Sequence, residues 1–267
     1  MNVKISLVSH GHFHLIDELG GVEILSKEKW IEICIVDNIG EHGFEQWCYE
    51  RGINYLKNDT CLGFGENNNK AFNHFYERNF EEANNWFFLV LNPDVLITVE
   101  QLKLLIETVH SNGIRFSCIN LFKDTNNKIY DNSVRNYPSL LDFISSFILS
   151  QNKTILDKSL IERPLYVDWA SGSFLLFDAK LYKALNGFDE NYFMYCEDVD
   201  ICLRANMIHD CKLTYLPHIQ ALHLAAHKNR KIFSKHFVWH IKSMCRYLMV
   251  KNRILISKYL NHLFYSQ

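Results

Sequence analysis

The run Trp86-Phe87-Phe88-Leu89-Val90-Leu91-Asn92-Pro93-Asp94 has the pattern that decides the fold. Its six consecutive apolar residues, followed by a polar turn, are typical of a strand buried on both faces of a parallel sheet. Similar apolar runs occupy residues 3–8, 31–36 and 114–119, and segments with helical spacing, such as 99–110, lie between the runs. This alternation predicts an α/β fold in which helices flank a mostly parallel sheet.

Polar residues follow several of the predicted strands. Asp37 follows the strand at 31–36, Asp94 follows the strand quoted above, and a Gly-Phe-Gly turn at 63–65 follows a short strand near 53–56. In open α/β sheets, ligands bind beyond the carboxyl ends of the strands. We therefore expect the binding site at this edge of the sheet.

The glycine turn and Asp94 offer two kinds of chemistry. Gly63 and Gly65 let the backbone approach a ligand, and the helix that follows offers free N–H groups to a phosphate or a sugar hydroxyl. A divalent cation on a diphosphate needs only one or two protein carboxylates, and Asp94 can supply one. The alternatives are a tight turn with an asparagine N-cap, and an Asx turn that caps a helix near Thr98.

A second polar cluster is Glu197-Asp198-Val199-Asp200, which follows an aromatic run at 192–195 and precedes Arg204. Carboxylates this close together raise one another's pKa unless a cation or a transferred proton lies among them. Carboxylates with raised pKa values are typical of a reactive or metal-binding site. The alternative interpretation is the start of a helix, where the helix dipole stabilises acidic residues.

Two further positions fit a site that binds a sugar and a metal ion. Trp169 begins a Trp-Ala-Ser-Gly-Ser-Phe segment, in which an indole can stack on a sugar ring and small residues leave room for hydroxyl groups. His223 can bind a metal ion through its imidazole. Taken alone, each residue is also explained as part of the core, as a tryptophan in a buried strand and a hydrogen-bonded histidine.

The composition sets the class of protein. A length of 267 residues with 48% hydrophobic residues fits one large domain, or a domain with a small appendage. No apolar run reaches the length of about 18 residues that spans a membrane. The first ten residues turn polar too early for a signal peptide and predict a strand instead. The eight cysteines include no Cys-x-x-Cys pair, so we expect reduced thiols and a cytoplasmic protein.

Charge is divided unevenly along the chain. The formal net charge is −2, yet beyond His223 there are nine Lys and Arg residues and no Asp or Glu. From about Arg230 the spacing predicts a helix with one apolar face and an opposite basic face. The apolar face comprises Phe233, Phe237, Ile241, Met244 and Leu248, and the basic face comprises Lys231, Lys235, Lys242, Arg246 and Arg253.

We therefore predict a main domain over residues 1–227 and a basic helical extension over residues 228–267. Such a helix is typical of association with an anionic membrane surface. Packing of the helix on the body of the protein is the alternative. A role in binding nucleic acid ranks lower, because the main domain is not basic and carries no known recognition motif.

In their order along the chain, these motifs resemble glycosyltransferase family 2, the inverting enzymes with a Rossmann-like GT-A fold. The resemblance covers about residues 3–227. Within the family, the chain is similar to bacterial rhamnosyltransferases of O-antigen and lipopolysaccharide assembly, which use dTDP-L-rhamnose and a polyprenyl-diphosphate-linked sugar, often N-acetylglucosamine. The narrower match rests on residues 133–138, on 193–204 and on the tail from Phe233. The family match rests on the strand ending Val8-Ser9-His10, Val36-Asp37-Asn38, Gly63 to Asn68, Leu91 to Asp94, Trp169 to Gly172, Gly187-Phe188-Asp189-Glu190, Phe193 to Asp200, and His223.

The resemblance implies a role for each matching residue. Asp198 is expected to be the catalytic base of a single displacement, and Asp37 to recognise the pyrimidine base of the nucleotide. Asp94, the last residue of a DxD motif, and His223 are expected to bind Mn²⁺ or Mg²⁺. The nucleotide-sugar would contact Ser9, Asp37, Gly63, Gly65, Asn67, Asn68, Asn92 and Asp94. The acceptor would contact Arg135, Trp169, Gly172 and Glu197.

Asn92 departs from the family pattern, which has an aspartate at this position. An amide oxygen carries less charge than a carboxylate, so we expect weaker metal binding. The resemblance also implies an enzyme that is peripheral on the inner face of the bacterial cytoplasmic membrane.

Three other functions remain open at this point. They are transfer of a different sugar, nucleotidyl transfer, and a scaffold that binds sugar nucleotides without catalysis. Nucleotidyltransferases usually have a loop rich in Gly and in Lys or Arg after the first strand, and residues 9–14 lack that composition.

Overall fold

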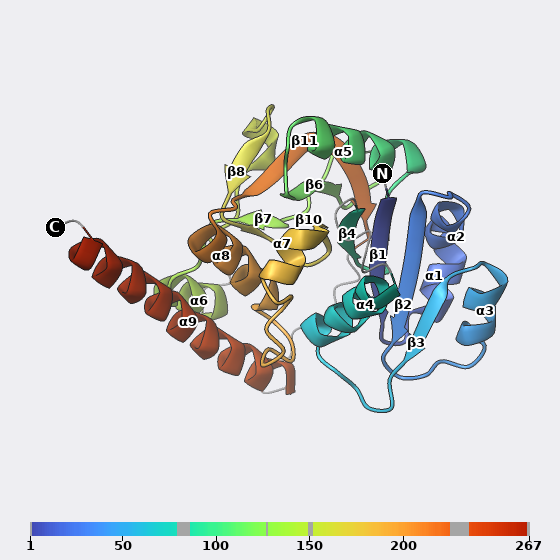
Figure 1. The fold of residues 1–267 in the computed structure, drawn as a ribbon, viewed down its shortest axis with the longest axis horizontal. Helices are drawn as coiled ribbons and strands as arrows, with labels where there is room; N and C mark the ends of the chain where they lie inside the picture. Colours follow the sequence, from blue (N-terminus) through green and yellow to red (C-terminus); the bar gives the residue numbers. More distant parts are fainter. Residues whose placement is uncertain (1, 79–85, 127, 149–151, 225–234, 266–267) are drawn as a thin grey trace.

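The computed structural model describes residues 2–78, 86–126, 128–148, 152–224 and 235–265. Figure 1 shows a twisted sheet with helices packed on it and a long C-terminal helix along one side. The strands are β1 Asn2–Ser9, β2 Ile31–Asp37, β3 Asn54–Lys57, β4 Trp86–Leu91, β5 Val95–Leu96, β6 Phe116–Phe122, β7 Val134–Arg135, β8 Leu165–Val167, β9 Trp169–Ala170, β10 Phe174–Asp178 and β11 Leu213–His223. The α-helices are α1 Phe13–Leu19, α2 Gly21–Ser26, α3 Phe44–Glu50, α4 Phe64–Arg78, α5 Val99–Ser111, α6 Leu140–Ile148, α7 Ala179–Ala184, α8 Glu197–His209 and α9 Lys235–Tyr265.

The main sheet has nine strands in the order β3-β2-β1-β4-β10-β6-β11-β5, and β8 also pairs with β11. β1 is parallel to β2 and to β4, and β2 is parallel to β3. β10 is antiparallel to both of its neighbours, whereas β6 and β11 are parallel to each other. A separate two-stranded sheet pairs β7 with β9. The predicted α/β fold with a mostly parallel sheet is confirmed.

Three central strands end at the same edge of the sheet. In the register of the sheet, Ser9 is paired with Asp37, and Leu7 is paired with Leu91. The residues that follow β1, β2 and β4 therefore emerge side by side, as expected for parallel strands. This edge carries the polar residues that the sequence singled out.

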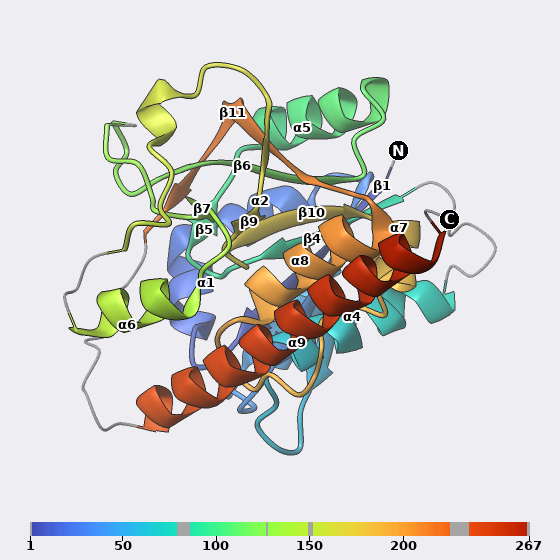
Figure 2. The ribbon, with the colours of Figure 1, turned by 90° about the vertical axis from the view of Figure 1, so that its left-hand side faces the viewer.

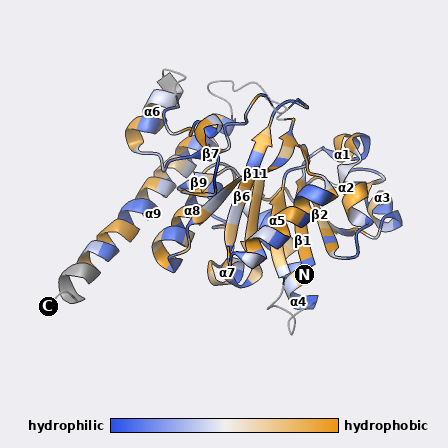
Figure 3. Cartoon of the chain, turned by 90° about the horizontal axis from the view of Figure 1, so that it is seen from above, coloured by the Kyte–Doolittle hydropathy of each residue, from blue (hydrophilic) through white to orange (hydrophobic). Residues whose placement is uncertain are grey.

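The core lies on both faces of the sheet, because the central strands alternate their side chains between two layers. Every residue of β4 is buried. Phe88 and Val90 pack in the layer that includes residues of α4, α7 and α8, and Leu89 and Leu91 pack in the layer that includes residues of α2, α3 and α5. Figure 3 shows apolar residues concentrated on the strands of the sheet.

The structure shifts one predicted strand. The strand expected at 114–119 begins two residues later, as β6. The reason lies at the end of α5, where Gly113 has a φ of 63° and the N–H of Ile114 donates to the carbonyl of Val109 at 2.8 Å. Ile114 therefore closes the helix instead of starting the strand.

The first half of α9 packs on the body of the protein (Figure 2). Tyr247 is fully buried, and its ring lies 6.1 Å from the ring of Phe143 in α6. Met244 and Leu248, from the predicted apolar face, contact the core. Arg246, from the predicted basic face, is instead partly buried against the body. Residues 225–234, which include Lys231 and Phe233, lie outside the described residues.

The solvent face of α9 is mixed rather than purely basic. Its residues recur at intervals of three and four, which places them on one side of a helix. We call this row the outer stripe, and all of its members are exposed: Val238, Lys242, Cys245, Met249, Arg253, Ile256 and Leu260. Among the residues that the structure describes, no helix is both long and apolar enough to cross a membrane.

Candidate active site

The loop after β2 is organised around a buried carboxylate. Asp37 is fully buried, and its oxygens accept hydrogen bonds from the N–H groups of Ile39, Gly40 and Glu41 at 3.1, 2.9 and 2.6 Å. The Tyr55 hydroxyl donates a fourth bond at 2.8 Å. Asp37 thus fixes the shape of the loop at the carboxyl edge, and recognition of a pyrimidine base by this residue stays a prediction.

Ser9 connects the end of β1 to the same loop. Its hydroxyl donates to the Glu41 carboxylate at 2.7 Å, and that carboxylate also accepts the N–H of Phe13 at 3.0 Å, at the start of α1. The edge of the sheet beside β1 and β2 is therefore held by a continuous set of hydrogen bonds.

The predicted asparagines form the buried support of the glycine turn. Asn67 donates to the carbonyl of Gly63 at 2.9 Å and accepts a bond from Asn58 at 2.6 Å. Asn68 donates to the carbonyl of Phe64 at 2.9 Å and accepts the Ser6 hydroxyl at 2.7 Å. Both asparagines are fully buried, so their side chains shape the wall of the site from within.

The glycine turn lies directly against the segment that leads to the acidic cluster. The N–H of Phe64 donates to the carbonyl of Phe193 at 3.2 Å. A Cβ atom on Gly63 would lie 2.7 Å from that carbonyl oxygen, and one on Gly65 would lie 2.7 Å from the side chain of Phe188. Glycine is therefore needed at both positions for close contact with the segment, and the structure brings together two motifs that are far apart in the sequence.

The strand end at β4 carries a three-residue cluster of opposite charges. Asp94 Oδ1 lies 3.4 Å from Nε2 of His223, at the end of β11. On the other side of the imidazole, Nδ1 lies 3.2 Å from Asp131 Oδ2, close enough for an ion pair although not aligned as a hydrogen bond. All three side chains are largely buried.

This arrangement shifts all three pKa values. Burial alone would lower the pKa of His223, but the carboxylates of Asp131 and Asp94 outweigh it and raise the pKa to about 9. Burial alone would raise the pKa of each carboxyl group, but contact with His223 outweighs it and lowers both. Sequence reasoning missed Asp131, because it lies in an irregular stretch and belongs to no recognisable motif.

Asp94 and His223 fit a divalent cation that also binds a diphosphate. No group of three or more His, Cys, Asp or Glu side chains within the described ranges could hold a metal ion alone. One carboxylate and one imidazole nitrogen 3.4 Å apart are nevertheless a suitable pair of protein ligands, because Mg²⁺-like ions keep several positions for phosphate oxygens and water. Asp131 would then hold the imidazole from behind, as carboxylates do for many metal-bound histidines.

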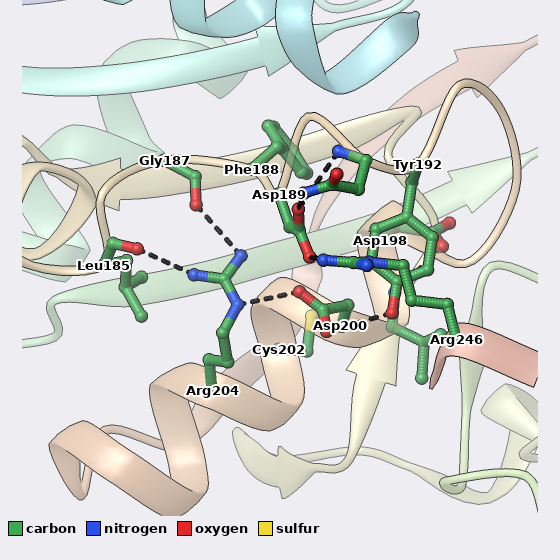
Figure 4. Close-up of polar contacts among 12 residues, drawn as sticks. Leu185, Gly187, Phe188, Asp189, Tyr192, Asp198, Asp200, Cys202, Arg204 and Arg246 are labelled. Carbon is green, nitrogen blue, oxygen red and sulfur yellow. Dashed lines mark hydrogen bonds and ion pairs between the residues drawn. The ribbon is translucent and has the colours of Figure 1, made fainter. Parts of the chain in front are cut away.

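The structure gives the three carboxylates of the acidic cluster different environments. Asp200 is fully buried and accepts a 2.7 Å hydrogen bond from Nε of Arg204 and a 3.2 Å bond from the Tyr192 hydroxyl (Figure 4). Arg204 in turn donates to the carbonyls of Leu185 and Gly187 at 2.7 and 3.0 Å. Asp200 and Arg204 therefore form an internal ion pair that anchors α8, and this accounts for one carboxylate of the three.

Asp198 and Glu197 lie at the first turn of α8, as the alternative interpretation expected. Asp198 accepts the N–H of Gly172 at 3.2 Å and that of Val199 at 2.9 Å. Burial raises the pKa of Asp198 despite these bonds. Burial and the charge of Asp198 raise the pKa of Glu197 to about 8, and within the described residues Glu197 Oε2 is buried without a hydrogen-bond partner. Both are properties of a site that exchanges protons.

The turn at 171–173 joins the two halves of the site. The N–H of Asn92, after β4, donates to the carbonyl of Ser173 at 3.0 Å, and the N–H of Gly172 donates to Asp198. Asn92 and Asp198, which are far apart in the sequence, are thereby attached to the same three-residue turn. The end of β4, which would face a diphosphate, and Asp198, which could act as a base, therefore lie at the same edge of the sheet.

Trp169 and Arg135 form one wall beside this turn. They face each other across the pairing of β7 with β9, and the guanidinium of Arg135 lies 5.2 Å from the centre of the indole. The indole N–H donates to the carbonyl of Asn136 at 2.9 Å. Arg135 is close enough for its charge to lower the pKa of Asp198, against the effect of burial. The structure thus assembles Arg135, Trp169, Gly172 and Asp198 at one place.

No family model matches the chain. A rhamnosyltransferase of Escherichia coli strain K12, WbbL, is 40% identical over 258 residues, which cover 96% of this chain and 96% of that protein. An N-acetylglucosaminyl-diphospho-decaprenol L-rhamnosyltransferase of Mycobacterium tuberculosis is 28% identical over 236 residues, or 82% of this chain and 75% of that protein.

Solved structures of glycosyltransferases share the fold. The structure of Staphylococcus aureus TarS, residues 1–349, with UDP-GlcNAc has a TM-score of 0.60 at 14% identity and matches 99% of this chain and 73% of that one. A mannosyltransferase of Pyrobaculum calidifontis with GDP-Man and Mn²⁺ has a TM-score of 0.55 at 12% identity, over 85% of this chain and 58% of that one. The fold of this chain is therefore the GT-A fold.

Proposed function

Because this chain belongs to the rhamnosyltransferase family of glycosyltransferases, we propose that it transfers L-rhamnose from dTDP-β-L-rhamnose to a polyprenyl-diphosphate-linked acceptor. The acceptor sugar is N-acetylglucosamine, and the product serves the assembly of O-antigen or a related cell-surface polysaccharide. The printed name of the mycobacterial relative, which describes such an acceptor, supports this choice. The observation that carries the proposal is the turn at 171–173, which binds both Asn92 and Asp198.

The chemistry follows from the position of Asp198. The acceptor hydroxyl gives its proton to the Asp198 carboxylate while its oxygen attacks the anomeric carbon on the side opposite the nucleotide. The bond from that carbon to the diphosphate oxygen breaks, and its electron pair leaves with dTDP. This single displacement inverts the anomeric centre, so a β-linked donor gives an α-rhamnoside. The raised pKa of Asp198 favours it as a base, and such catalysis contributes about 10²–10⁴-fold.

The donor lies along the carboxyl edge in this proposal. Asp37 and Ser9 shape the nucleotide end through the loop that they hold. Gly63, Gly65, Asn67 and Asn68 supply the turn beside the sugar nucleotide. Asp94 and His223 would hold Mn²⁺ or Mg²⁺ against the diphosphate. When bound, the ion offsets the negative charge that develops on the leaving group.

The acceptor lies beside β7 and β9 in this proposal. Trp169 is buried and supports this wall from the core, so that it would border the acceptor sugar from behind. Arg135 attracts the diphosphate of the lipid carrier. Gly172 lets this turn pack closely against the glycine turn, because a Cβ atom there would lie 2.8 Å from the ring of Phe64. The Oε2 atom of Glu197 is buried and has no hydrogen-bond partner among the described residues. In this proposal, an acceptor hydroxyl donates a hydrogen bond to it.

We place the enzyme at the inner face of the cytoplasmic membrane, where its lipid-linked acceptor lies. Support comes from the tail beyond His223, which contains no acidic residue, and from the outer stripe of α9, which combines exposed apolar side chains with Lys242 and Arg253. Such a stripe is suited to the interface of an anionic bilayer.

The test is an assay of the purified protein with dTDP-L-rhamnose and a short-chain lipid-diphosphate N-acetylglucosamine, with and without Mn²⁺ or Mg²⁺. We expect a mass gain of one deoxyhexose on the acceptor and an α-linkage by NMR. Binding of dTDP without transfer would reject the donor sugar or the acceptor but retain the nucleotide site. Absence of dTDP binding would reject the proposal.

A further inference from the structure

The turn that precedes α8 has an unusual backbone. Tyr195 and Cys196 have φ values of 73° and 65°, so two consecutive residues with side chains adopt the left-handed conformation. Residues other than glycine avoid this region, and they remain in it only where the surrounding structure holds them. Glu197 and Asp198 follow at once, so the direction in which Asp198 enters the site depends on this turn.

The contacts that hold the turn come from α9. The hydroxyl of Ser243, which is buried, donates to the carbonyl of Met194 at 2.8 Å. The Tyr195 hydroxyl lies 3.2 Å from Nδ1 of His236, within hydrogen-bond distance. The ring of Tyr195 also packs on the ring of His240, with 4.9 Å between their centres.

The other end of the same loop is attached to α9 as well. Arg246 donates from Nε and Nη2 to Oδ2 of Asp189 at 2.9 and 2.5 Å (Figure 4). Its guanidinium lies 5.4 Å from the centre of the Tyr192 ring, and the Tyr192 hydroxyl donates to Asp200 in α8. Residues 189–196 are thus fixed to α9 at both ends. Arg246 therefore anchors this loop instead of forming part of an exposed basic face.

The opposite side of this loop faces the glycine turn. The Phe193 carbonyl accepts the N–H of Phe64, while the Phe193 ring packs on Trp239 of α9 with 4.7 Å between the ring centres. The loop therefore lies between the turn that borders the nucleotide-sugar and the C-terminal helix. A change in the position of α9 would alter the loop and, through Tyr195 and Cys196, the start of α8.

We propose that α9 is a positioning element of the active site. Its residues Ser243 and Arg246 hold the loop 189–196 in the conformation that directs Asp198 toward the acceptor. This inference rests on the proposed function in one respect, the role of Asp198 as the base. It goes beyond that function because it makes the first half of α9 necessary for the chemical step, separately from any contact of its outer stripe with a membrane.

The experiment compares Ser243→Ala and Arg246→Met with Ser257→Ala, a matched control at an exposed position near the end of the same helix. Transfer is measured on a water-soluble acceptor without lipid vesicles. We expect kcat to fall about tenfold in the first two variants, since Ser243→Ala loses the hydrogen bond beside the strained turn and Arg246→Met loses the ion pair at the other end of the loop. The KM for the donor should stay within about twofold, because the loop at 37–41, which Asp37 holds at the nucleotide end, is not altered. Ser257→Ala should match the unmodified protein.

Hydrogen exchange gives a second readout that does not depend on the donor sugar. Amides in residues 189–199 should exchange faster in Ser243→Ala and Arg246→Met, while amides of β1 and β2 keep their protection. An unchanged exchange pattern in this loop would overturn the inference, whatever the activity. So would a normal kcat, or a loss of kcat that merely follows a lowered melting temperature. Lack of rhamnose transfer by the unmodified protein, together with the expected exchange pattern, would reject only the proposed donor or acceptor.

Discussion

Asp131 lies behind His223, with its Oδ2 atom 3.2 Å from the imidazole Nδ1, on the side away from Asp94. The imidazole is therefore held between two carboxylates, one at each ring nitrogen. Asn92 removes one carboxylate from the metal motif that the sequence predicted. Asp131 places another carboxylate beside His223, which is one of the two proposed metal ligands.

The first prediction concerns this carboxylate. Asp131→Asn should weaken Mn²⁺ binding in the presence of dTDP by about 10–100-fold, because the imidazole loses the charge that orients it. Titration of Mn²⁺ followed by electron paramagnetic resonance measures the affinity directly. Asp157→Asn is the control, since Asp157 is exposed and its carboxylate accepts hydrogen bonds from Ser159 in its own local turn. Equal affinities in the two variants would contradict the role of Asp131.

The second prediction separates the carboxylates of the acidic cluster. Asp198→Asn should keep the folded structure and lose transfer by about 10²–10⁴-fold, because no other group takes the proton. Asp200→Asn should instead destabilise the protein by roughly 3–5 kcal/mol, because Arg204 is left without its buried partner. Steady-state kinetics and urea unfolding distinguish the two effects. Normal turnover in Asp198→Asn would remove the assignment of the base.

The third prediction concerns pH and Glu197. Its folded-state pKa of about 8 lies above its value in the unfolded chain, so Glu197 favours the folded state at low pH. As the pH rises from about 4.5 to 8, the unfolded chain releases this proton first and stability is lost. Glu197→Gln should remove this loss and gain on the order of 1–3 kcal/mol at pH 8 relative to pH 5. Urea unfolding at the two pH values measures the difference.

The control for this measurement is Glu162→Gln, at an exposed position. It should show the same pH dependence as the unmodified protein. If Glu197→Gln showed the same loss of stability between pH 5 and pH 8 as the unmodified protein, the prediction would be wrong. Glu197 would then be ionised in the folded protein without a cost in stability.

The fourth prediction concerns the membrane. Met249→Glu combined with Ile256→Glu should reduce co-sedimentation with anionic vesicles by at least about tenfold, since it removes apolar contacts and adds like charges at the interface. Leu160→Glu provides a control at a residue that is 78% exposed outside α9. Binding should also weaken as salt is added. Sedimentation of both variants to the same extent would exclude the outer stripe as the membrane contact.

Much of the fold could be predicted from the sequence, because apolar runs such as that of β4 have few structures open to them. The helix predicted at 99–110 is also confirmed as α5, and Thr98 caps it by accepting the N–H of Gln101 at 3.2 Å. The order of the motifs was specific enough to predict the family, which the comparison with known rhamnosyltransferases confirms. Each motif alone was ambiguous, and only the order of the motifs along the chain indicated the family.

The site could be predicted less completely, because its contacts depend on the fold. Spacing could not indicate that Gly172 would bond Asp198, which is 26 residues away. Helical periodicity placed Arg246 on a basic face of the tail, but it could not reveal that Asp189 faces this position. Spacing alone does not distinguish the three carboxylates of the acidic cluster, and the separate roles of Asp198 and Glu197 came from the resemblance. Only the fold separates Asp200, which binds Arg204, from Glu197 and Asp198.

The outer stripe of α9 has a consequence for how the enzyme meets its acceptor. In the proposed function, an enzyme attached by this row of side chains searches a surface rather than a volume, and the proposed lipid-linked acceptor moves in that same plane. The opposite side of the same helix contacts the loop before Asp198. In the two proposals taken together, one helix both attaches the enzyme to the membrane and orients its active site toward an acceptor in that membrane.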